Sequence, residues 1–288
     1  MANGIVIIDK PTGWTSMDIC AKIRGILHEK RVGHGGTLDP MATGVLPVFV
    51  GHATRAVEFA ENSRKEYVAG IRFGLMTDTQ DVTGTVLERR PASVSRAELE
   101  AILPRFTGAI SQIPPMYSAV KIGGQKLYDL ARKGKEVERK PRSVIIYELE
   151  LLEQTEDGDW TLRCACSKGT YVRTLAHDIG QLLGCGAALS SLRRTMAAGF
   201  TLEQAVTLED VQRQGESLLL PTDRYFAEYP AYIISSRAQE TRCRNGNPVM
   251  DAALSDGTYR VYGSDGIFLC LSEARGGTLT SVKNFFGA

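Results

Sequence analysis

The sequence predicts an α+β fold: a mixed, largely antiparallel sheet flanked by helices, followed by a small β-rich domain. Strand-like and helix-like segments are mixed without the regular strand–helix–strand spacing of a doubly wound sheet. From about residue 225 onward the segments become short and strand-like, and glycines separate them. The 288 residues are enough for one large or two ordinary domains. We therefore predict a first domain over residues 1–228 and a second over residues 229–288.

The first third of the chain alternates short strands with short helices. A helix is predicted at residues 16–29, because Ile19 and Ile23 recur at helical spacing and Thr15 or Ser16 can cap its start. Strands are expected where apolar residues run together or alternate, and turn chemistry is expected where Asp, Thr and Gly cluster. The expected strands are 4–9, 45–50 and 65–73, the further helices are 55–62 and 95–106, and the turn is 78–84.

The remainder of the first domain contains the longest predicted strands. Pro114 and Pro115 open an irregular segment, which leads into a helix and ends near Pro141. Residues 189–200 have a mixed pattern that favours neither a helix nor a strand. The other expected elements are helices at 125–133, 170–183 and 207–212 and strands at 142–154 and 160–167; in the second domain they are a helix at 237–244 and strands at 259–262, 267–271 and 279–282.

Composition excludes several classes of protein. No apolar run approaches the length of a membrane span, and the N-terminus lacks a secretory signal pattern. The six cysteines are scattered rather than arranged as a disulfide framework, and no second pair gives Cys164 and Cys166 the spacing of a zinc site. We therefore expect a cytoplasmic protein without membrane contact, metal or other cofactor.

Residues 121–142 form a basic segment in an otherwise nearly neutral chain. The formal net charge of the whole chain is +1, whereas these 22 residues contain eight Lys or Arg and three acidic residues. A basic stripe on a neutral protein is typical of contact with a phosphate backbone, although a solvated helix face has the same composition. We interpret residues 115–142 as an RNA-binding insertion that reaches away from the sheet.

The loop at residues 33–44, with the sequence GHGGTLDPMATG, presents a single carboxylate. Glycines free the backbone before Asp39, and Pro40 biases Asp39 toward an extended conformation. A carboxylate held at the end of a loop can act as a nucleophile or base, but an ordinary turn built on an Asp side chain fits the local sequence equally well.

The full loop resembles the catalytic loop of the bacterial tRNA pseudouridine synthases of the TruB type. Four further segments, in the same order as in that family, resemble its other motifs: DKP at 9–11 with TS at 15–16, KEY at 65–67, GTYVR at 169–173 and LSSLRRT at 189–195. Together they cover most of residues 4–200. The resemblance implies a pseudouridine synthase-like core that isomerises the uridine at position 55 in the T loop of tRNA.

The same resemblance implies roles for individual residues. Asp39 is expected to be the sole essential nucleophile, with Arg173 as its partner and Tyr67 as an aromatic platform for the flipped base. His34 is expected to help extrude that base rather than to act as an acid or base. Tyr171, Leu192 and Lys10 are matched to substrate contacts.

RNA recognition is expected to extend beyond the pocket. The resemblance matches the basic insertion to a segment that closes over the T arm, with Lys121, Lys126, Arg132 and Lys133 on the RNA backbone. It matches the C-terminal part to a small PUA-type RNA-binding module. The expected partner is tRNA alone, bound by a monomer without guide RNA.

Three alternatives are open at this point. An RNA-binding protein without catalysis would keep the basic segment and the C-terminal domain but would not need Asp39, Tyr67 and Arg173 together. A guide-RNA-dependent synthase resembles the same core but carries longer extensions for protein partners. A hydrolase using Asp39 and His34 would lack a Ser or Cys nucleophile with a matched base and oxyanion loop.

Overall fold

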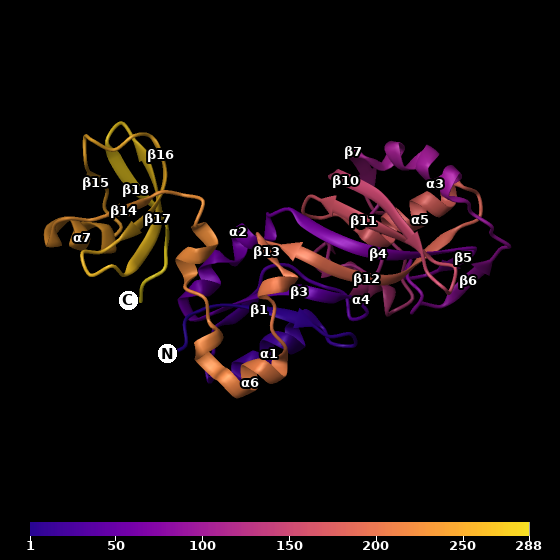
Figure 1. Cartoon of the computed structure of the whole chain (residues 1–288), viewed down its shortest axis with the longest axis horizontal. Helices are drawn as coiled ribbons and strands as arrows, with labels where there is room; N and C mark the ends of the chain where they lie inside the picture. Colours follow the sequence, from indigo (N-terminus) through magenta and orange to yellow (C-terminus); the bar gives the residue numbers. More distant parts are fainter. Residues whose placement is uncertain (288) are drawn as a thin grey trace.

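The computed structural model describes residues 1–287, which form a large sheet with flanking helices and a smaller sheet at one end of an elongated molecule (Figure 1). The larger sheet has nine strands among the described residues, in the order β1-β3-β12-β4-β11-β10-β7, with β2 beside β3 and β13 beside β12. All of its neighbouring strands are antiparallel except β3 and β12. Its strands are β1 Gly4–Lys10, β2 Val32–His34, β3 Thr43–Val50, β4 Lys65–Phe73, β7 Gly108–Gln112, β10 Arg142–Gln154, β11 Trp160–Cys166, β12 Ala187–Ala197 and β13 Phe200–Thr201.

The helices are short, and local signals in the sequence explain where they begin. In α1 (Ser16–Leu27) the Thr15 hydroxyl accepts from the Asp18 amide at 3.1 Å, while the Asp18 carboxylate accepts from the Thr15 amide at 2.9 Å. This reciprocal cap satisfies two amides that the helix leaves free. The other helices are α2 Val57–Glu61, α3 Arg96–Ile102, α4 Leu127–Ala131, α5 Val172–Leu182, α6 Leu208–Gln214 and α7 Arg237–Arg244, with 3-10 turns η1 Gly51–Ala56, η2 Leu103–Phe106, η3 Leu202–Gln204, η4 Gly215–Leu218 and η5 Thr222–Phe226.

Two small hairpins project from the large sheet. The first joins β5 (Leu75–Thr77) to β6 (Val86–Arg89), and the second joins β8 (Lys121–Ile122) to β9 (Gln125–Lys126). The first hairpin is fastened to the large sheet, because the Val82 amide donates to the Leu189 carbonyl at 2.9 Å and the Leu189 amide donates to the Gln80 carbonyl at 3.0 Å. The second hairpin lies within the basic insertion.

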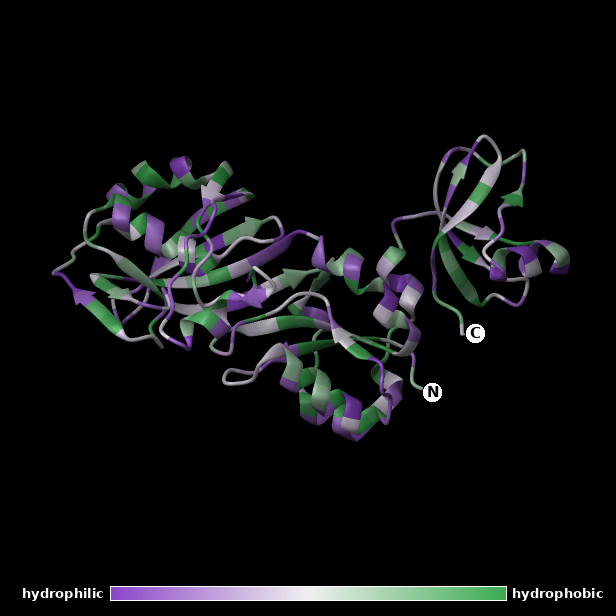
Figure 2. Cartoon of the chain, turned by 180° about the vertical axis from the view of Figure 1, so that it is seen from behind, coloured by the Kyte–Doolittle hydropathy of each residue, from purple (hydrophilic) through white to green (hydrophobic). Residues whose placement is uncertain are grey.

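The C-terminal sheet is a separate unit with its own core. Its strands are β14 Ala231–Ile233, β15 Val249–Met250, β16 Gly257–Tyr262, β17 Phe268–Arg275 and β18 Thr278–Asn284, in the order β14-β16-β17-β18-β15. It packs on the larger unit through aromatic rings: the ring centroids of Phe226 and Phe285 lie 5.3 Å apart. Arg55 adds hydrogen bonds to the carbonyls of Asn284 and Phe286, both at 3.2 Å. Figure 2 shows that α7, at the far end of this unit, is largely hydrophilic.

The structure confirms the predicted α+β class and most of the predicted elements. The strands predicted at 65–73 and 142–154 are β4 and β10 with the same bounds, and the helix predicted at 16–29 is α1, which ends at a left-handed His28 (φ 50°). The boundary proposed between residues 228 and 229 stays a prediction. No helix formed by residues 1–287 combines the length and the apolar character that crossing a membrane requires.

Residues 189–200, whose sequence pattern favours neither a helix nor a strand, lie mostly in the central strand β12, which ends at Ala197. It pairs with β4 over most of its length, with register shifts between Leu189 and Ser191 and between Arg194 and Met196. Each shift breaks the two-residue alternation by which a strand is recognised. The helix predicted at 95–106 also divides, into α3 and the 3-10 turn η2, which begins next to Pro104.

Candidate active site

Asp39 lies in the segment between β2 and β3, and the neighbouring residues hold that segment in place. Leu38 is buried, and its amide donates to the Ser16 hydroxyl at 2.8 Å. The Ala42 amide donates to the Asp39 carbonyl at 3.0 Å and closes the turn after the carboxylate. The Asp39 side chain is 36% exposed, so its carboxylate faces solvent from a loop whose backbone is fixed.

The structure brings Asp39 and Arg173 together, although 133 residues of sequence separate them. Arg173 lies in the first turn of α5, and its Nε atom is 2.8 Å from Asp39 Oδ2. Its other nitrogens are also occupied: Nη1 donates to the Thr79 carbonyl at 2.8 Å and Nη2 donates to the Tyr117 carbonyl at 2.9 Å. The Arg173 side chain is 5% exposed. A buried guanidinium in this position stabilises the negative charge of the carboxylate.

Asp81 is a second carboxylate beside Arg173. From the sequence it was predicted only to lie in the turn at residues 78–84. Its Oδ2 atom lies 3.7 Å from Arg173 Nη1. Its Oδ1 atom accepts from the Thr83 amide at 3.0 Å and from the Thr79 hydroxyl at 2.9 Å, which is the expected turn chemistry. Asp81 therefore shapes the turn between β5 and β6 and offers Arg173 a buried countercharge. Only the folding of this turn against α5 distinguishes Asp81 from an ordinary turn residue.

Arg194 is a further residue for which the sequence predicted no role. It is fully buried, and it donates to the carbonyls of Val45 at 2.7 Å, Gly36 at 3.1 Å and Thr37 at 3.4 Å. No carboxylate among residues 1–287 pairs with it. These hydrogen bonds hold the loop before Asp39 against β3. The register of β12 on β4 places Arg194 opposite Tyr67.

Lys10 supports the same loop from the end of β1. Its ammonium is fully buried and donates to the carbonyls of Trp14 at 2.7 Å, Pro11 at 2.9 Å and Pro40 at 3.3 Å. Burial lowers the pKa of Lys10 to about 8, even though the nearby Asp39 carboxylate acts in the opposite direction. The structure thus places Lys10 beneath the loop, and its contact with substrate stays a prediction.

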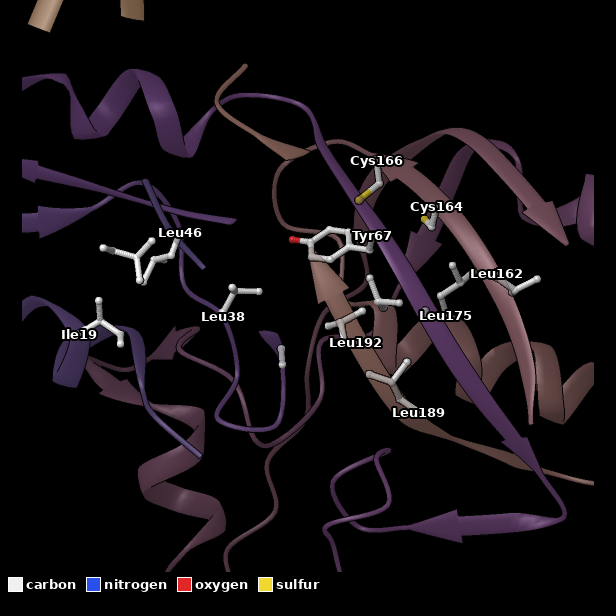
Figure 3. Packing of buried hydrophobic residues seen from close by; sticks show 14 of the residues in the cluster. Ile19, Leu38, Leu46, Tyr67, Leu162, Cys164, Cys166, Leu175, Leu189 and Leu192 are labelled. Atoms are coloured by element: carbon white, nitrogen blue, oxygen red, sulfur yellow. The ribbon is translucent and has the colours of Figure 1, made fainter. Parts of the chain in front are cut away.

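Tyr67 and Leu192 lie together on adjacent strands of the sheet. Figure 3 shows the Tyr67 ring beside Leu192, with its hydroxyl directed toward the side on which Leu38 lies. Tyr67 is 7% exposed and Leu192 is 8% exposed. Burial raises the pKa of Tyr67 to about 12, so the phenol is neutral at physiological pH. An apolar side chain and a protonated phenol that lie side by side can pack against a flat ring.

Tyr171 and His34 complete the set of matched residues. The Tyr171 amide donates to Gln112 Oε1 at 3.0 Å, and its carbonyl accepts from Gln112 Nε2 at 3.2 Å, so the start of α5 is fastened to β7. Burial and, to a smaller extent, the charge of Arg194 lower the pKa of His34. Its Nδ1 atom is buried without a hydrogen-bond partner among residues 1–287. The lowered pKa favours the neutral imidazole, and within residues 1–287 its Nδ1 atom has no partner that would relay a proton.

The basic insertion reaches the active site through its backbone. The carbonyl of Tyr117 that binds Arg173 belongs to this segment. Lys121, Arg132 and Lys133 are exposed, whereas Lys126 donates to the Tyr128 hydroxyl at 2.9 Å. The Arg132 guanidinium lies 5.3 Å from the Tyr128 ring centroid. Within residues 1–287, no group of three His, Cys, Asp or Glu side chains is arranged to hold a metal ion.

Comparison with known proteins gives matches along nearly the whole chain. Residues 24–172 match the model of the TruB family pseudouridylate synthase N-terminal domain, and residues 173–226 match the model of the tRNA pseudouridylate synthase B C-terminal domain. The tRNA pseudouridine synthase B of Pseudomonas fluorescens is 46% identical over 282 residues, which cover 94% of this chain and 91% of that protein. The protein of the same name from Geobacillus kaustophilus is 46% identical over 256 residues, which cover 85% of this chain and 90% of that protein.

Solved structures with the same fold include chains that belong to larger complexes. A chain in the crystal structure of a Cbf5-Nop10-Gar1 complex superposes with a TM-score of 0.74 at 27% identity, covering 99% of this chain and 85% of that one. A chain from an H/ACA RNP bound to a substrate RNA containing 2'-deoxyuridine gives a TM-score of 0.73 at 25% identity, covering 99% of this chain and 86% of that one.

Replacing Arg173 by lysine should abolish most of the activity that depends on Asp39. One ammonium cannot reach Asp39, the Thr79 carbonyl and the Tyr117 carbonyl at once, whereas the guanidinium does so with three separate nitrogens. Because the Arg173 guanidinium is buried, disturbing its contacts with Asp39 and the two carbonyls costs about 3–5 kcal/mol, so we expect kcat to fall about 100-fold or more in the Arg173→Lys variant. Single-turnover assays would measure this, and near-normal turnover by a folded variant would contradict the role given to the pair.

Replacing Arg194 by methionine should weaken the fold, since it leaves buried carbonyls without donors. We expect the free energy of unfolding to fall by about 2–4 kcal/mol, measured by urea unfolding. The neighbouring Arg193 is the matched control, because its ion pair with Asp9 (2.7 Å) is 42% and 34% exposed on the two sides. Arg193→Met should cost no more than about 1 kcal/mol. Equal losses in the two variants would show that the carbonyl contacts of Arg194 contribute little.

Proposed function

Because the chain belongs to the TruB family of pseudouridylate synthases, we propose that it converts the uridine at position 55 in the T loop of tRNA to pseudouridine. The family membership and the names of the relatives support the coarser statement, an isomerase that acts on uridine in tRNA. The observation that carries the proposal is the half-exposed Asp39 carboxylate, 2.8 Å from the buried Arg173.

The reaction needs one ionised carboxylate and no cofactor. The bond between nitrogen 1 of uracil and ribose breaks, the base rotates, and a new bond joins its carbon 5 to the ribose. Carbon 5 loses its proton and nitrogen 1 gains one, so the product is an isomer of the substrate. Asp39 is the nucleophile or base in this scheme. Arg173 stabilises its charge, and Asp81 and two carbonyls hold Arg173 in place. Asp39 therefore meets the substrate already oriented.

The target base must leave the RNA stack before Asp39 can reach it. Extrusion costs a few kcal/mol, which stacking on an aromatic side chain partly offsets. Tyr67 provides this stacking in our proposal, and its position beside Leu192 on the next strand supports that role. The neutral His34 packs against the RNA and helps extrusion, and Tyr171 contacts the flipped nucleotide. Lys10 acts by holding the loop at Pro40.

We propose that tRNA is bound along both units of the chain. The exposed Lys121, Arg132 and Lys133, together with Lys126, contact the phosphates of the T arm. The five-stranded C-terminal sheet acts as a PUA-like RNA-binding module. The enzyme works in the cytoplasm as a monomer, without guide RNA. The structural likeness to chains from H/ACA complexes makes guide-dependent action the alternative to test.

The proposed reaction can be followed by tritium release. An unmodified tRNA transcript carrying uridine tritiated at carbon 5 should lose one tritium per tRNA, because carbon 5 exchanges its hydrogen for the bond to ribose. The purified protein should release it without any RNA guide or partner protein. Asp39→Ala should release none, and a transcript with cytidine at position 55 should lose the signal.

The controls separate the alternatives. Asp157→Ala removes an exposed carboxylate in the turn between β10 and β11 and should leave release unchanged. Tight binding of tRNA without release would favour a binding protein, and release that appears only with added guide RNA would favour the guide-dependent enzyme. Release that survives the cytidine substitution would place the target at another uridine.

Neutralising the exposed cations of the insertion should weaken binding more than chemistry. We expect the combined variant Lys121→Ala, Arg132→Ala and Lys133→Ala to raise the Kd for tRNA and to make binding less sensitive to salt. The slope of log K against log salt should fall by up to about 3, one for each lost phosphate contact. Filter binding over a salt series measures this slope. An unchanged slope would remove these residues from the RNA interface.

A further inference from the structure

Trp14 is an exposed aromatic side chain next to the loop that carries Asp39. The chain has two tryptophans: Trp160 is 7% exposed and donates to the Val94 carbonyl at 2.9 Å, whereas Trp14 is 37% exposed. Trp14 directly precedes the cap of α1, and neither the large core nor the C-terminal core contains it. A large aromatic ring left in solvent on a well-ordered segment is a feature that a ligand can use.

The backbone of Trp14 is fixed relative to Asp39. Its carbonyl accepts from the buried Lys10 ammonium at 2.7 Å, and the same ammonium donates to the Pro40 carbonyl at 3.3 Å. The Gly13 amide also donates to the Pro40 carbonyl, at 2.8 Å. The loop before α1 and the loop that carries Asp39 are therefore joined directly. The backbone of Trp14 is thus held close to Pro40, the residue that follows Asp39.

A shallow concavity of about 490 Å³ opens beside the ring, lined by Gly13, Trp14, Asp18, Ala21 and Lys22. A Cβ atom added to Gly13 would meet nothing within 4 Å, so the space next to Gly13 is open. Lys22 is exposed and supplies a positive charge. The Asp18 carboxylate accepts from the Thr15 amide at 2.9 Å and from its hydroxyl at 2.7 Å. The concavity thus combines an aromatic face with the exposed ammonium group of Lys22.

We propose that Trp14 and this concavity bind an unpaired nucleobase of the RNA substrate, by stacking on the indole with Lys22 near the adjoining phosphate. Proteins that bind single-stranded nucleic acids combine aromatic side chains with positive charges, and stacking needs no particular base. The site is distinct from the Tyr67 platform, which lies within the sheet. This inference rests on the proposed function, because RNA must be the ligand that reaches Asp39.

Tryptophan fluorescence tests the stacking directly. Binding of an unmodified tRNA transcript should quench the wild-type protein, because a stacked base quenches indole emission. The Trp14→Phe variant retains only the buried Trp160 and should show little quenching while binding tRNA nearly as well. Trp14→Ala should raise the Kd for tRNA about 5-fold or more, with kcat at saturating tRNA nearly unchanged.

The control is Met17→Ala, which removes a neighbouring side chain that is 57% exposed but lies outside the concavity. Its Kd should equal that of the wild type. Equal quenching of the wild type and Trp14→Phe, or an unchanged Kd for Trp14→Ala, would each overturn the inference. Tritium release by the wild type tests the proposed function independently of the fluorescence. Release without Trp14 quenching rejects the stacking site alone, and quenching without release rejects the proposed reaction alone.

Discussion

The contact between Asp39 and Arg173 is the constraint on which the rest of the structure depends. A buried guanidinium is costly unless its donors are satisfied, and here three different segments satisfy them. The loop after β2 supplies Asp39, the turn after β5 supplies Asp81 and the Thr79 carbonyl, and the insertion supplies the Tyr117 carbonyl. Arg173 therefore fixes the relative positions of parts of the chain that are distant in sequence.

A second set of interactions holds the loop that carries Asp39: buried cationic side chains donate hydrogen bonds to its backbone carbonyls. Lys10 binds the Pro40 carbonyl from one side, and Arg194 binds the carbonyls of Gly36 and Thr37 from the other. Both side chains are fully buried. This arrangement leaves the Asp39 carboxylate free for its partner, since no backbone restraint on the loop uses that group. It also surrounds the carboxylate with more positive than negative charge, which suits a site that receives an anionic RNA chain.

Local periodicity in the sequence predicted the fold class and the long strands, whereas the pairing of Asp39 with Arg173 was predicted only by the resemblance to the TruB family. Local periodicity did not predict the strand character of β12, because two register shifts disrupt its alternation. From the sequence, Asp81 was predicted only to be a turn residue, and no role was predicted for Arg194. Both residues act through long-range contacts: Asp81 faces a helix 91 residues away from its turn, and Arg194 binds carbonyls about 150 positions earlier. No local pattern encodes such contacts, so the support of the site could only be found in three dimensions.

One hydrogen bond joins the basic insertion to Arg173, and it would give the RNA binding that we propose a direct physical connection to the pair of Asp39 and Arg173. The Tyr117 carbonyl accepts from Arg173 Nη2 at 2.9 Å, while Lys121 and Arg132 lie exposed farther along the same segment. A shift of the segment that moves Tyr117 would leave one donor of a buried guanidinium unsatisfied, which costs free energy in a site shielded from water. Contacts that hold the insertion in its present position therefore also keep Arg173 oriented on Asp39. If these cations bind the RNA backbone as we propose, the same contacts would also favour the arrangement in which the carboxylate is held for reaction.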